Sequence, residues 1–279
     1  MVKLEPRSER MLFAPLIWRL AMKTEQVPWS DMAASATEAV YVLRSAQRLF
    51  KQDIHCVSFD TWMEAEAAGI KIKRDNLGMP VGRPAPIANL RPVEDVLSAQ
   101  PITRTVEILR RLALEPGPGI VPVATMTAAA TLHNRIGRDT TSLSAAGDRL
   151  DYIRQIMLGL TRLYCEAGAG ALLFLEEEAS DDFAELTEFT ALFNLAEYFA
   201  TPVFLLSLQR INPDGLSIVS SLGAKYLTPD ETTDGIVALP LADGGAHAGN
   251  GWLAMSRWEI DPETDPNTLQ DWRKNLSRA

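Results

Sequence analysis

The sequence predicts an α/β protein with the (β/α)8 barrel fold, on two observations. About eight short apolar segments, most of them followed by a helical pattern, occur along the 279 residues, and such a barrel needs roughly 250. Their almost continuous apolar character is typical of parallel strands buried on both faces. A doubly wound open sheet is the alternative. The stretch 209–235 leaves little room for a full helix between two strands, so we expect the barrel to be trimmed there.

The elements follow one another along the whole chain, and apolar segments flank each Pro/Gly cluster closely, so residues 1–279 are expected to form one domain. The predicted strands are 11–18, 54–60, 119–124, 170–176, 202–208, 235–239 and 252–257, with a weaker one at 216–219 or 225–228. Residues with a 3.6-residue apolar period predict helices over 31–50, 103–114, 148–167, 182–199 and 266–276. Ser30 or Asp31 can cap the first of these helices, and Asp181 or Asp182 the fourth.

Composition narrows the functional class. The net charge of −9, with no basic run to offset it, argues against nucleic-acid binding. The longest apolar stretch, 167–175, is far short of the roughly 20 residues that a membrane span needs. The N-terminus carries charges where a signal peptide has its apolar core, and two cysteines form neither a disulfide framework nor a metal knuckle. We therefore expect a cytoplasmic protein that binds neither membranes nor nucleic acid.

Acidic side chains near the ends of two predicted strands are the first candidates for chemistry, because barrel enzymes place their active sites at the carboxyl ends of the strands. Asp60 ends the second strand and can act as an acid or base, or it can cap the following helix. Glu64, one turn later, can join it in a substrate-binding pair, although a solvated helix face is the simpler interpretation. Glu176 ends the fourth strand and is a candidate general acid. Glu177 beside it can contact substrate, although an acidic run before a helix often only compensates the helix dipole.

One arginine and one histidine complete the set. Arg19, just past the first strand, can hold a substrate carboxylate or pair with an acidic neighbour. His247 lies in a glycine-rich loop, where backbone can approach a ligand, and is the histidine favoured for catalysis. His55 is expected in the core, and His133 is expected too deep on its helix to reach a barrel mouth. The chain has no HxH, HExxH or CxxC spacing, so no zinc site is predicted.

Several segments, in order from about residue 30 to the C-terminus, resemble the uroporphyrinogen decarboxylase superfamily. They are FDTWMEAEAAGIKI (59–72), RTVEILRRL (104–112), YIRQIMLGLTRLYCEAGAGALLFLEE (152–177) and SRWEIDPETDPNTLQDW (256–272). The resemblance implies a (β/α)8 barrel and one of two activities, porphyrinogen decarboxylation or cobalamin-linked methyl transfer.

The decarboxylase features are mostly absent. Asp60 and Gly69 reproduce the spacing between the family's aspartate and a following glycine. The arginine-rich motif near the first strand is missing, and only Arg19 can partly replace it. The family's tyrosine falls at Ala129. A porphyrinogen with four carboxylates needs several cations, so uroporphyrinogen itself is not the expected substrate.

The methyltransferase branch fits better, because EIDPETDP (259–266) resembles its C-terminal signature. That branch holds zinc through side chains whose positions here are Leu206, Leu208 and Trp258. None of these is a metal ligand, so zinc is not expected.

Three hypotheses follow. The first is a zinc-independent methyltransferase or demethylase that moves a one-carbon group from a small donor to a corrinoid (cobalamin) or tetrahydrofolate, with Asp60, Glu176 and His247 as catalytic residues. The second is a decarboxylase or related lyase acting on a small carboxylated aromatic or pyrrolic substrate. The third is a non-catalytic relative that binds a corrinoid protein or a partner enzyme.

Overall fold

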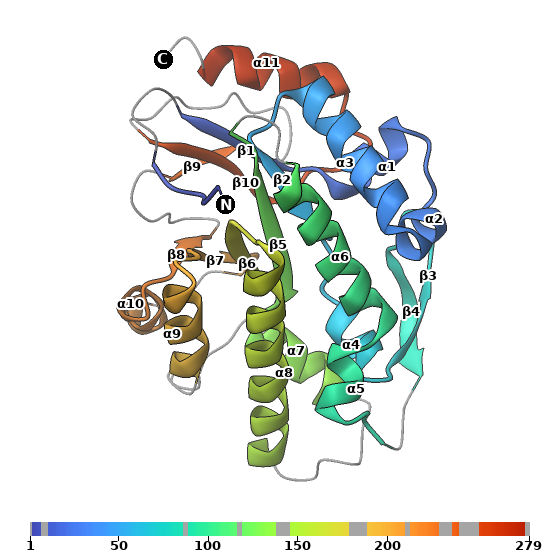
Figure 1. The fold of residues 1–279 in the computed structure, drawn as a ribbon, viewed down its shortest axis with the longest axis vertical. Coiled ribbons are helices and arrows are strands. Elements are labelled where there is room, and N and C mark those ends of the chain that lie inside the picture. The colour runs from blue at the N-terminus through green and yellow to red at the C-terminus, as the bar shows by residue number, and fades with distance from the viewer. Residues whose placement is uncertain are drawn as a thin grey trace.

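The structure is a computed structural model, and it describes residues 2–6, 11–85, 89–115, 119–137, 146–178, 189–209, 213–228, 236–239 and 251–276. The described strands form two parallel sheets and one antiparallel hairpin (Figure 1). The first sheet has three strands in the order β1-β10-β9, namely β1 (Leu12–Leu16), β10 (Leu253–Glu259) and β9 (Ile236–Leu239). The second has five in the order β2-β5-β6-β7-β8, namely β2 (Ile54–Val57), β5 (Val121–Thr127), β6 (Ala171–Glu176), β7 (Val203–Ser207) and β8 (Lys225–Leu227). These sheets confirm the α/β class.

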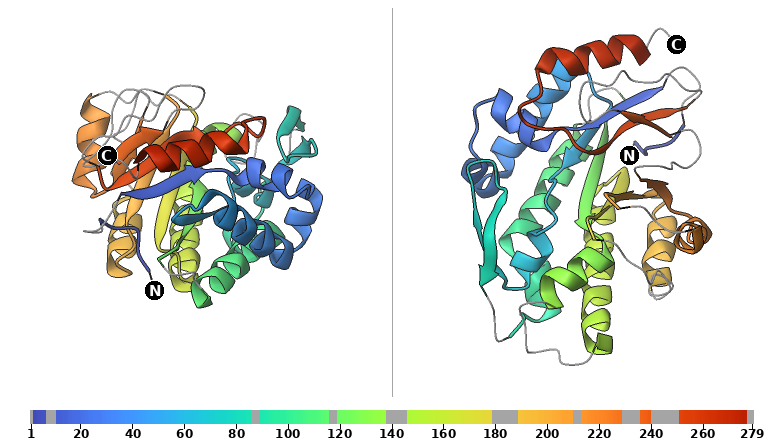
Figure 2. Two further views of the ribbon diagram at one scale, coloured as in Figure 1. Left: turned by 90° about the horizontal axis from the view of Figure 1, so that it is seen from above. Right: turned by 180° about the vertical axis from the view of Figure 1, so that it is seen from behind.

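Helices cover the outer side of the parallel strands (Figures 1 and 2). The described helices are α1 (Trp18–Thr24), α2 (Trp29–Ala34), α3 (Ala36–Phe50), α4 (Met63–Ala67), α5 (Val93–Leu97), α6 (Gln100–Leu114), α7 (Ala129–Gly137), α8 (Ala146–Ala167), α9 (Thr190–Tyr198), α10 (Pro213–Ser221) and α11 (Pro266–Leu276). Neighbouring helices α3, α6, α8 and α9 pack against one another in that order. None of the helices described is long and apolar enough to cross a membrane.

The two parallel sheets meet at the amino ends of β1 and β2. The backbone N–H of Asp53 donates to the carbonyl of Phe13 over 2.8 Å, and the N–H of Phe13 donates to the Asp53 carboxylate over the same distance. The Asp53 carbonyl in turn accepts from Val121 of β5. A single buried aspartate thus joins strands of both sheets.

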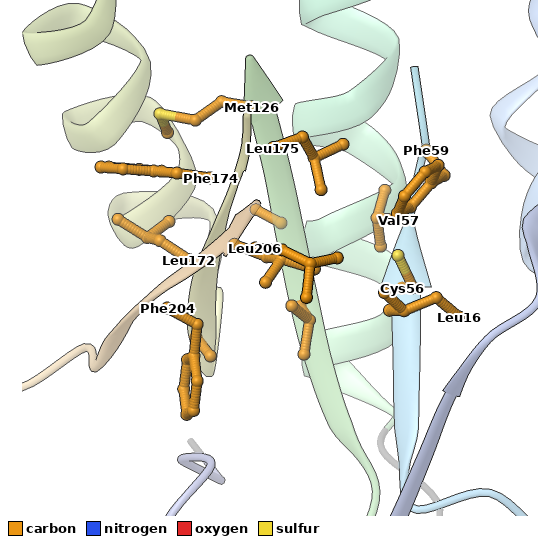
Figure 3. Packing of buried hydrophobic residues seen from close by; sticks show 14 of the residues in the cluster. Leu16, Cys56, Val57, Phe59, Met126, Leu172, Phe174, Leu175, Phe204 and Leu206 are labelled. Carbon is orange, nitrogen blue, oxygen red and sulfur yellow. The ribbon is translucent and has the colours of Figure 1, made fainter. Parts of the chain in front are cut away.

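The two faces of the larger sheet have different neighbours. Paired residues of parallel strands point to the same face, so the register places Leu175 and Leu206 on one face together. Phe174 points to the opposite face and packs against Phe193 of α9, with 6.1 Å between ring centroids. Figure 3 shows apolar side chains from these strands, with Cys56 of β2 among them. Both faces of the sheet are therefore buried, as the continuous apolar segments predict.

Three sequence predictions need correction. The helix expected over 31–50 is two helices, and Ser35 separates them by accepting a hydrogen bond from the N–H of Glu38. The expected caps are therefore wrong, because Ser30 and Asp31 lie inside α2. The stretch 209–235 does contain a helix, α10, so residues 216–219 are helical and the strand is β8 at 225–227.

The remaining predicted strands and the helices over 103–114, 148–167 and 266–276 are confirmed, with ends shifted by up to three residues. Of the helix predicted over 182–199, the structure shows α9, whereas Asp181 and Asp182 lie outside the described residues. A hairpin of β3 (Lys71–Arg74) and β4 (Pro80–Ala85) was not predicted, and β4 lies in the Pro/Gly cluster 76–92 that the sequence indicated as loop. This hairpin supplies a residue of the candidate site.

Candidate functional site

Asp60 lies three residues beyond β2 and is held by two different contacts. One carboxylate oxygen, Oδ1, accepts a hydrogen bond from the N–H of Trp62 over 3.0 Å. The other, Oδ2, pairs with the guanidinium of Arg74 over 2.8 Å. The N-cap of α4 itself is Trp62, so Asp60 caps the turn that begins at Thr61 but is not the N-cap of the helix. Its carboxylate is placed at the carboxyl edge of the sheet by a salt bridge.

Arg74 reaches Asp60 from the β3–β4 hairpin and is almost entirely buried. Its guanidinium also pairs with Glu66 of α4 and lies over the ring of Trp29, 5.0 Å from its centroid. The ring packs directly on Gly78 in the hairpin turn. The hairpin therefore fixes Arg74, and Arg74 fixes Asp60.

Arg19 forms a second ion pair at the same edge, as one of its two sequence interpretations predicts. Its guanidinium pairs with Glu259 at the end of β10, its backbone N–H donates to the same carboxylate over 2.6 Å, and Nη2 donates to the carbonyl of Phe59 over 3.3 Å. Burial raises the pKa of Glu259 to about 7, although Arg19 opposes the shift. These contacts tie β10, α1 and the segment after β2 together, and a substrate role for Arg19 stays a prediction.

A third arginine, Arg104 of α6, was not among the sequence candidates. It lines a cavity of about 10 Å³ together with Arg19 and Asp60, and Trp18, Trp29 and Phe59 provide aromatic walls. Its Nη1 donates to the carbonyl of Ala33, whereas its buried Nε has no hydrogen-bond partner in the described part of the chain. The sequence could have pointed to Arg104, because it lies four residues before the buried Ile108. That spacing puts a charged side chain on the apolar stripe of the helix.

Glu64 is fully buried, so its interpretation as part of a solvated helix face is wrong. Both carboxylate oxygens accept hydrogen bonds from Thr127 at the end of β5, one from the N–H over 3.1 Å and one from the hydroxyl over 2.5 Å. Burial raises the pKa of Glu64 to about 7, and the Thr127 hydrogen bonds oppose that shift. The carboxyl group anchors α4 to β5, and a contact with substrate is untested.

Glu176 lies apart from the Asp60–Arg74–Arg104 group. It shares a strand face with Phe174, towards the helices, and accepts hydrogen bonds from the Thr131 hydroxyl and, over 3.1 Å, from the N–H of Glu178. It borders a cavity of about 30 Å³ between β6 and helices α7 to α10. Burial raises its pKa to about 7, with Thr131 opposing. The structure therefore supplies a carboxyl group that can release a proton near neutral pH, but in a separate pocket.

Glu177 is connected back to Asp60 through an arginine. Its carboxylate pairs with Arg135 of α7, whose guanidinium lies 4.1 Å from the centroid of the Trp62 ring. Trp62 in turn donates its backbone N–H to Asp60. Glu177 thus supports the wall of the site, and direct contact with substrate stays a prediction.

The histidines give no site among the described residues. His55 is buried, as expected for a core histidine, and burial lowers its pKa to about 4. His133 of α7 accepts a weak hydrogen bond from Arg149 of α8. His247 lies outside the described residues, so its predicted catalytic role has no structural test.

Zinc does not fit the positions where the family resemblance would place its ligands. Leu206 is buried in the core, Leu208 is partly exposed, and Trp258 packs edge-on against Phe59 with 5.1 Å between ring centroids. Hydrocarbon and indole side chains offer no ligand atom to zinc. Within the described ranges, no group of three histidine, cysteine, aspartate or glutamate residues could hold a metal ion.

Comparison with known proteins supports the fold. No protein-family model matches the chain, and no curated protein matches it. Among solved structures, the chain is similar to a methyltransferase from Methanosarcina mazei, with a TM-score of 0.72 and 13% identity over 98% of this chain and 95% of that one. At this identity the likeness is one of fold, and it extends over nearly the whole of both chains. The resemblance to the uroporphyrinogen decarboxylase superfamily remains a prediction.

Proposed function

We propose that this protein is a zinc-independent methyltransferase or demethylase that takes a methyl or one-carbon group from a small donor, with Asp60 at its reaction centre. The observation that carries the proposal is the position of Asp60. Its carboxylate lies at the carboxyl edge of a parallel sheet, beside a cavity with aromatic walls, and Arg74 holds it in place. The overall likeness to a methyltransferase supports the same reaction type.

The proposal includes a (β/α)8 barrel. The strands of the larger sheet follow one another in chain order, β2-β5-β6-β7-β8, whereas a doubly wound sheet reverses its strand order. The backbone hydrogen bond from the N–H of Asp53 to the carbonyl of Phe13 places β1 next to β2, so that β1 and β10 continue the order of the larger sheet. Eight parallel strands in this order support a barrel, and Asp60 would then lie at its carboxyl edge.

The chain's own residues suggest a division of roles. Arg74 and the N–H of Trp62 each occupy one oxygen of Asp60, which leaves lone pairs on both oxygens to orient a donor and stabilise positive charge that develops on it. Glu176 stays the predicted general acid because its pKa is raised to about 7, but it borders a pocket apart from Asp60, so we derive no proton transfer to a donor held at Asp60. Glu64 has a similarly raised pKa, but it is fully buried and both of its oxygens are bonded to Thr127, so it receives no catalytic role here.

The carrier of the methyl group is proposed from the family resemblance alone. A corrinoid or tetrahydrofolate does not fit the described cavity beside Asp60, because 10 Å³ is about the space of one water molecule. We therefore derive no step through either carrier. A separate corrinoid protein or partner enzyme that presents the carrier at the barrel edge is the corresponding prediction.

Methyl transfer to cobalamin or tetrahydrofolate from methoxyaromatic acids and other small methyl donors tests the function directly. We expect Asp60→Asn to lower kcat/KM by about 100-fold, the scale of a lost electrostatic contact in a transition state. Asp95→Asn, at an exposed position on α5, is the control and should retain full activity. An Asp60→Asn variant as active as the parent chain would refute the assignment of Asp60.

A carboxy-lyase on a small carboxylated aromatic or pyrrolic substrate is the second candidate. Two arginines in one cavity, Arg19 and Arg104, favour it, because guanidinium groups bind carboxylates. Release of CO2 from such an acid, in the absence of any methyl acceptor, would favour the lyase over the methyltransferase.

A further inference from the structure

We infer that a groove between α3 and α6 binds an acidic amphipathic helix of another protein. The two helices pack side by side on the outer side of the larger sheet (Figure 1). The groove between them has a volume of about 440 Å³. It is lined by Thr37, Val40, Tyr41, Arg44, Arg48, Arg111, Leu114 and Glu115. None of these residues belongs to the candidate site, so the inference goes beyond the proposed function.

Contacts between the two helices fix the shape of the groove. Arg111 of α6 donates to the Thr37 hydroxyl over 2.7 Å, and Arg44 of α3 pairs with Glu115 over 3.0 Å. Both chain segments therefore run in the same direction along the groove. Each helix precedes a strand of the larger sheet, so the helix ends lie towards the amino ends of β2 and β5. Asp60 lies at the opposite edge, and a protein bound in the groove leaves that edge free.

Two large apolar side chains border the groove and are open to solvent. Leu114 is 81% exposed and Tyr41 is 53% exposed. Apolar side chains that gather on a surface with polar residues around them are typical of protein interaction sites. Tyrosine and arginine are also the residues that are enriched at the energetic centres of protein interfaces. The pair of Tyr41 and Leu114 therefore offers a contact for an apolar side chain of a partner.

The charge of the groove selects an acidic partner. Three arginines and one glutamate line it, in a chain whose net charge is −9. Arg44 pairs with Glu115, and Arg111 pairs with Glu107 over 2.7 Å. Arg48 is exposed and makes no ion pair within the described part of the chain, where its Nε donates to the carbonyl of Arg44. Carboxylates of a partner complement this positive groove and avoid the repulsion that they meet over an acidic surface.

The length of the groove and its charge favour a helix of a different protein over a second copy of this chain. Along α3 the groove extends from Thr37 to Arg48, about 16 Å at the rise of an α-helix, which matches three turns of a bound helix. An amphipathic helix can lay its apolar stripe into such a groove with charged side chains at the rim. A symmetric dimer through this groove would instead bring the arginines of both copies together, and like charges repel.

Random peptides of about 12 residues, the length of three helical turns, are the probe. They are displayed on phage and selected against the immobilised full chain. We expect the enriched peptides to carry an excess of aspartate and glutamate, with apolar residues three or four positions apart. Binding of synthetic copies, followed by fluorescence anisotropy, should weaken several-fold between about 50 and 500 mM salt. No enrichment, or enriched peptides without an acidic excess, would overturn the inference.

Variants of exposed groove residues show whether the peptides bind there. Arg48→Glu, Tyr41→Ala and Leu114→Ala should each weaken peptide binding by about 10-fold, the scale of an important interface residue. Arg162→Glu makes the same charge change at an exposed position on α8 and should bind as the parent does. All four variants should unfold within about 2 °C of the parent, because the altered side chains are exposed.

Peptide affinity unchanged by Arg48→Glu and Leu114→Ala would show that the peptides bind elsewhere and would overturn the inference. Sedimentation of the chain alone tests the second copy. A dimer that Arg48→Glu dissociates would assign the groove to self-association and would equally overturn the assignment to a different protein. Methyl transfer by Arg48→Glu should equal that of the parent, because Arg48 lies outside the candidate site, so this inference and the proposed function can fail separately.

Discussion

Replacement of Glu64 by glutamine should change how the stability of the protein depends on pH. Glu64 is fully buried, and both of its oxygens accept hydrogen bonds from Thr127. Burial raises its pKa from 4.5 to about 7. In the unfolded chain the carboxyl group ionises at its ordinary pKa, whereas in the folded protein it keeps its proton to higher pH.

The sign and size of the effect follow from proton linkage. Between pH 4.5 and 7 the folded state holds more protons at Glu64 than the unfolded state does, so stability falls as pH rises through this range. The stabilisation is fully present below pH 4.5 and is lost above pH 7. A pKa difference of this size corresponds to about 3 kcal/mol. Glutamine carries no charge at any pH and removes this dependence.

Urea denaturation followed by tryptophan fluorescence at pH 5 and pH 8 measures the effect. Relative to the parent, Glu64→Gln should be more stable at pH 8 than at pH 5 by up to about 3 kcal/mol. Contributions from Glu176 and Glu259 occur in both proteins and cancel in the difference. Glu94→Gln, at an exposed position on α5, is the control and should change stability by less than ~0.5 kcal/mol. If Glu64→Gln differs from the parent by the same free energy at both pH values, Glu64 does not titrate as the structure indicates.

Two further predictions concern the elements around the site. Gly78→Ala should destabilise the β3–β4 hairpin, because Gly78 has φ +79° and an added Cβ would lie 2.0 Å from the Trp29 ring. We expect a loss of at least 1 kcal/mol in thermal unfolding, accompanied by lower activity through Arg74, and an unchanged melting temperature would contradict this account. Ser35→Ala should lower the free energy of unfolding by about 1 kcal/mol through loss of the α3 cap. Ser35→Asn, which can also cap, should restore most of it, and equal stability of the alanine and asparagine variants would count against a capping role.

Local pattern was sufficient to predict the parallel strands. Segments such as 170–176 and 202–208 are apolar along their whole length, since each strand is buried on both faces, and they appear as β6 and β7. The β3–β4 hairpin was missed because its residues do not alternate strictly and Pro80, Gly82 and Pro84 read as a loop. The break at Ser35 was missed because the apolar period continues across it.

The residues of the candidate site also fall into those that the local sequence predicts and those that only the folded structure shows. Asp60 was identified from its position after a strand, because the carboxyl end of a strand can be read along the chain. Arg74 and Arg104 come from a hairpin and from the buried face of a helix, and no local spacing connects them to Asp60. Glu64 was expected at a solvated surface, because the sequence around it does not reveal that Thr127, 63 residues further along the chain, lies opposite its carboxylate.

The sequence by itself therefore determined the α/β class, most of the strands and the acidic residue at the end of β2. These features depend on burial periodicity and on the order of elements along the chain. Tertiary structure alone decided which charges are paired. Arg19 is joined to Glu259 and Arg74 to Asp60 and Glu66, while Arg104 has no carboxylate partner among the described residues. Ion pairing depends on distances of a few ångströms between residues far apart in the chain, and only the packing of helices and strands sets those distances.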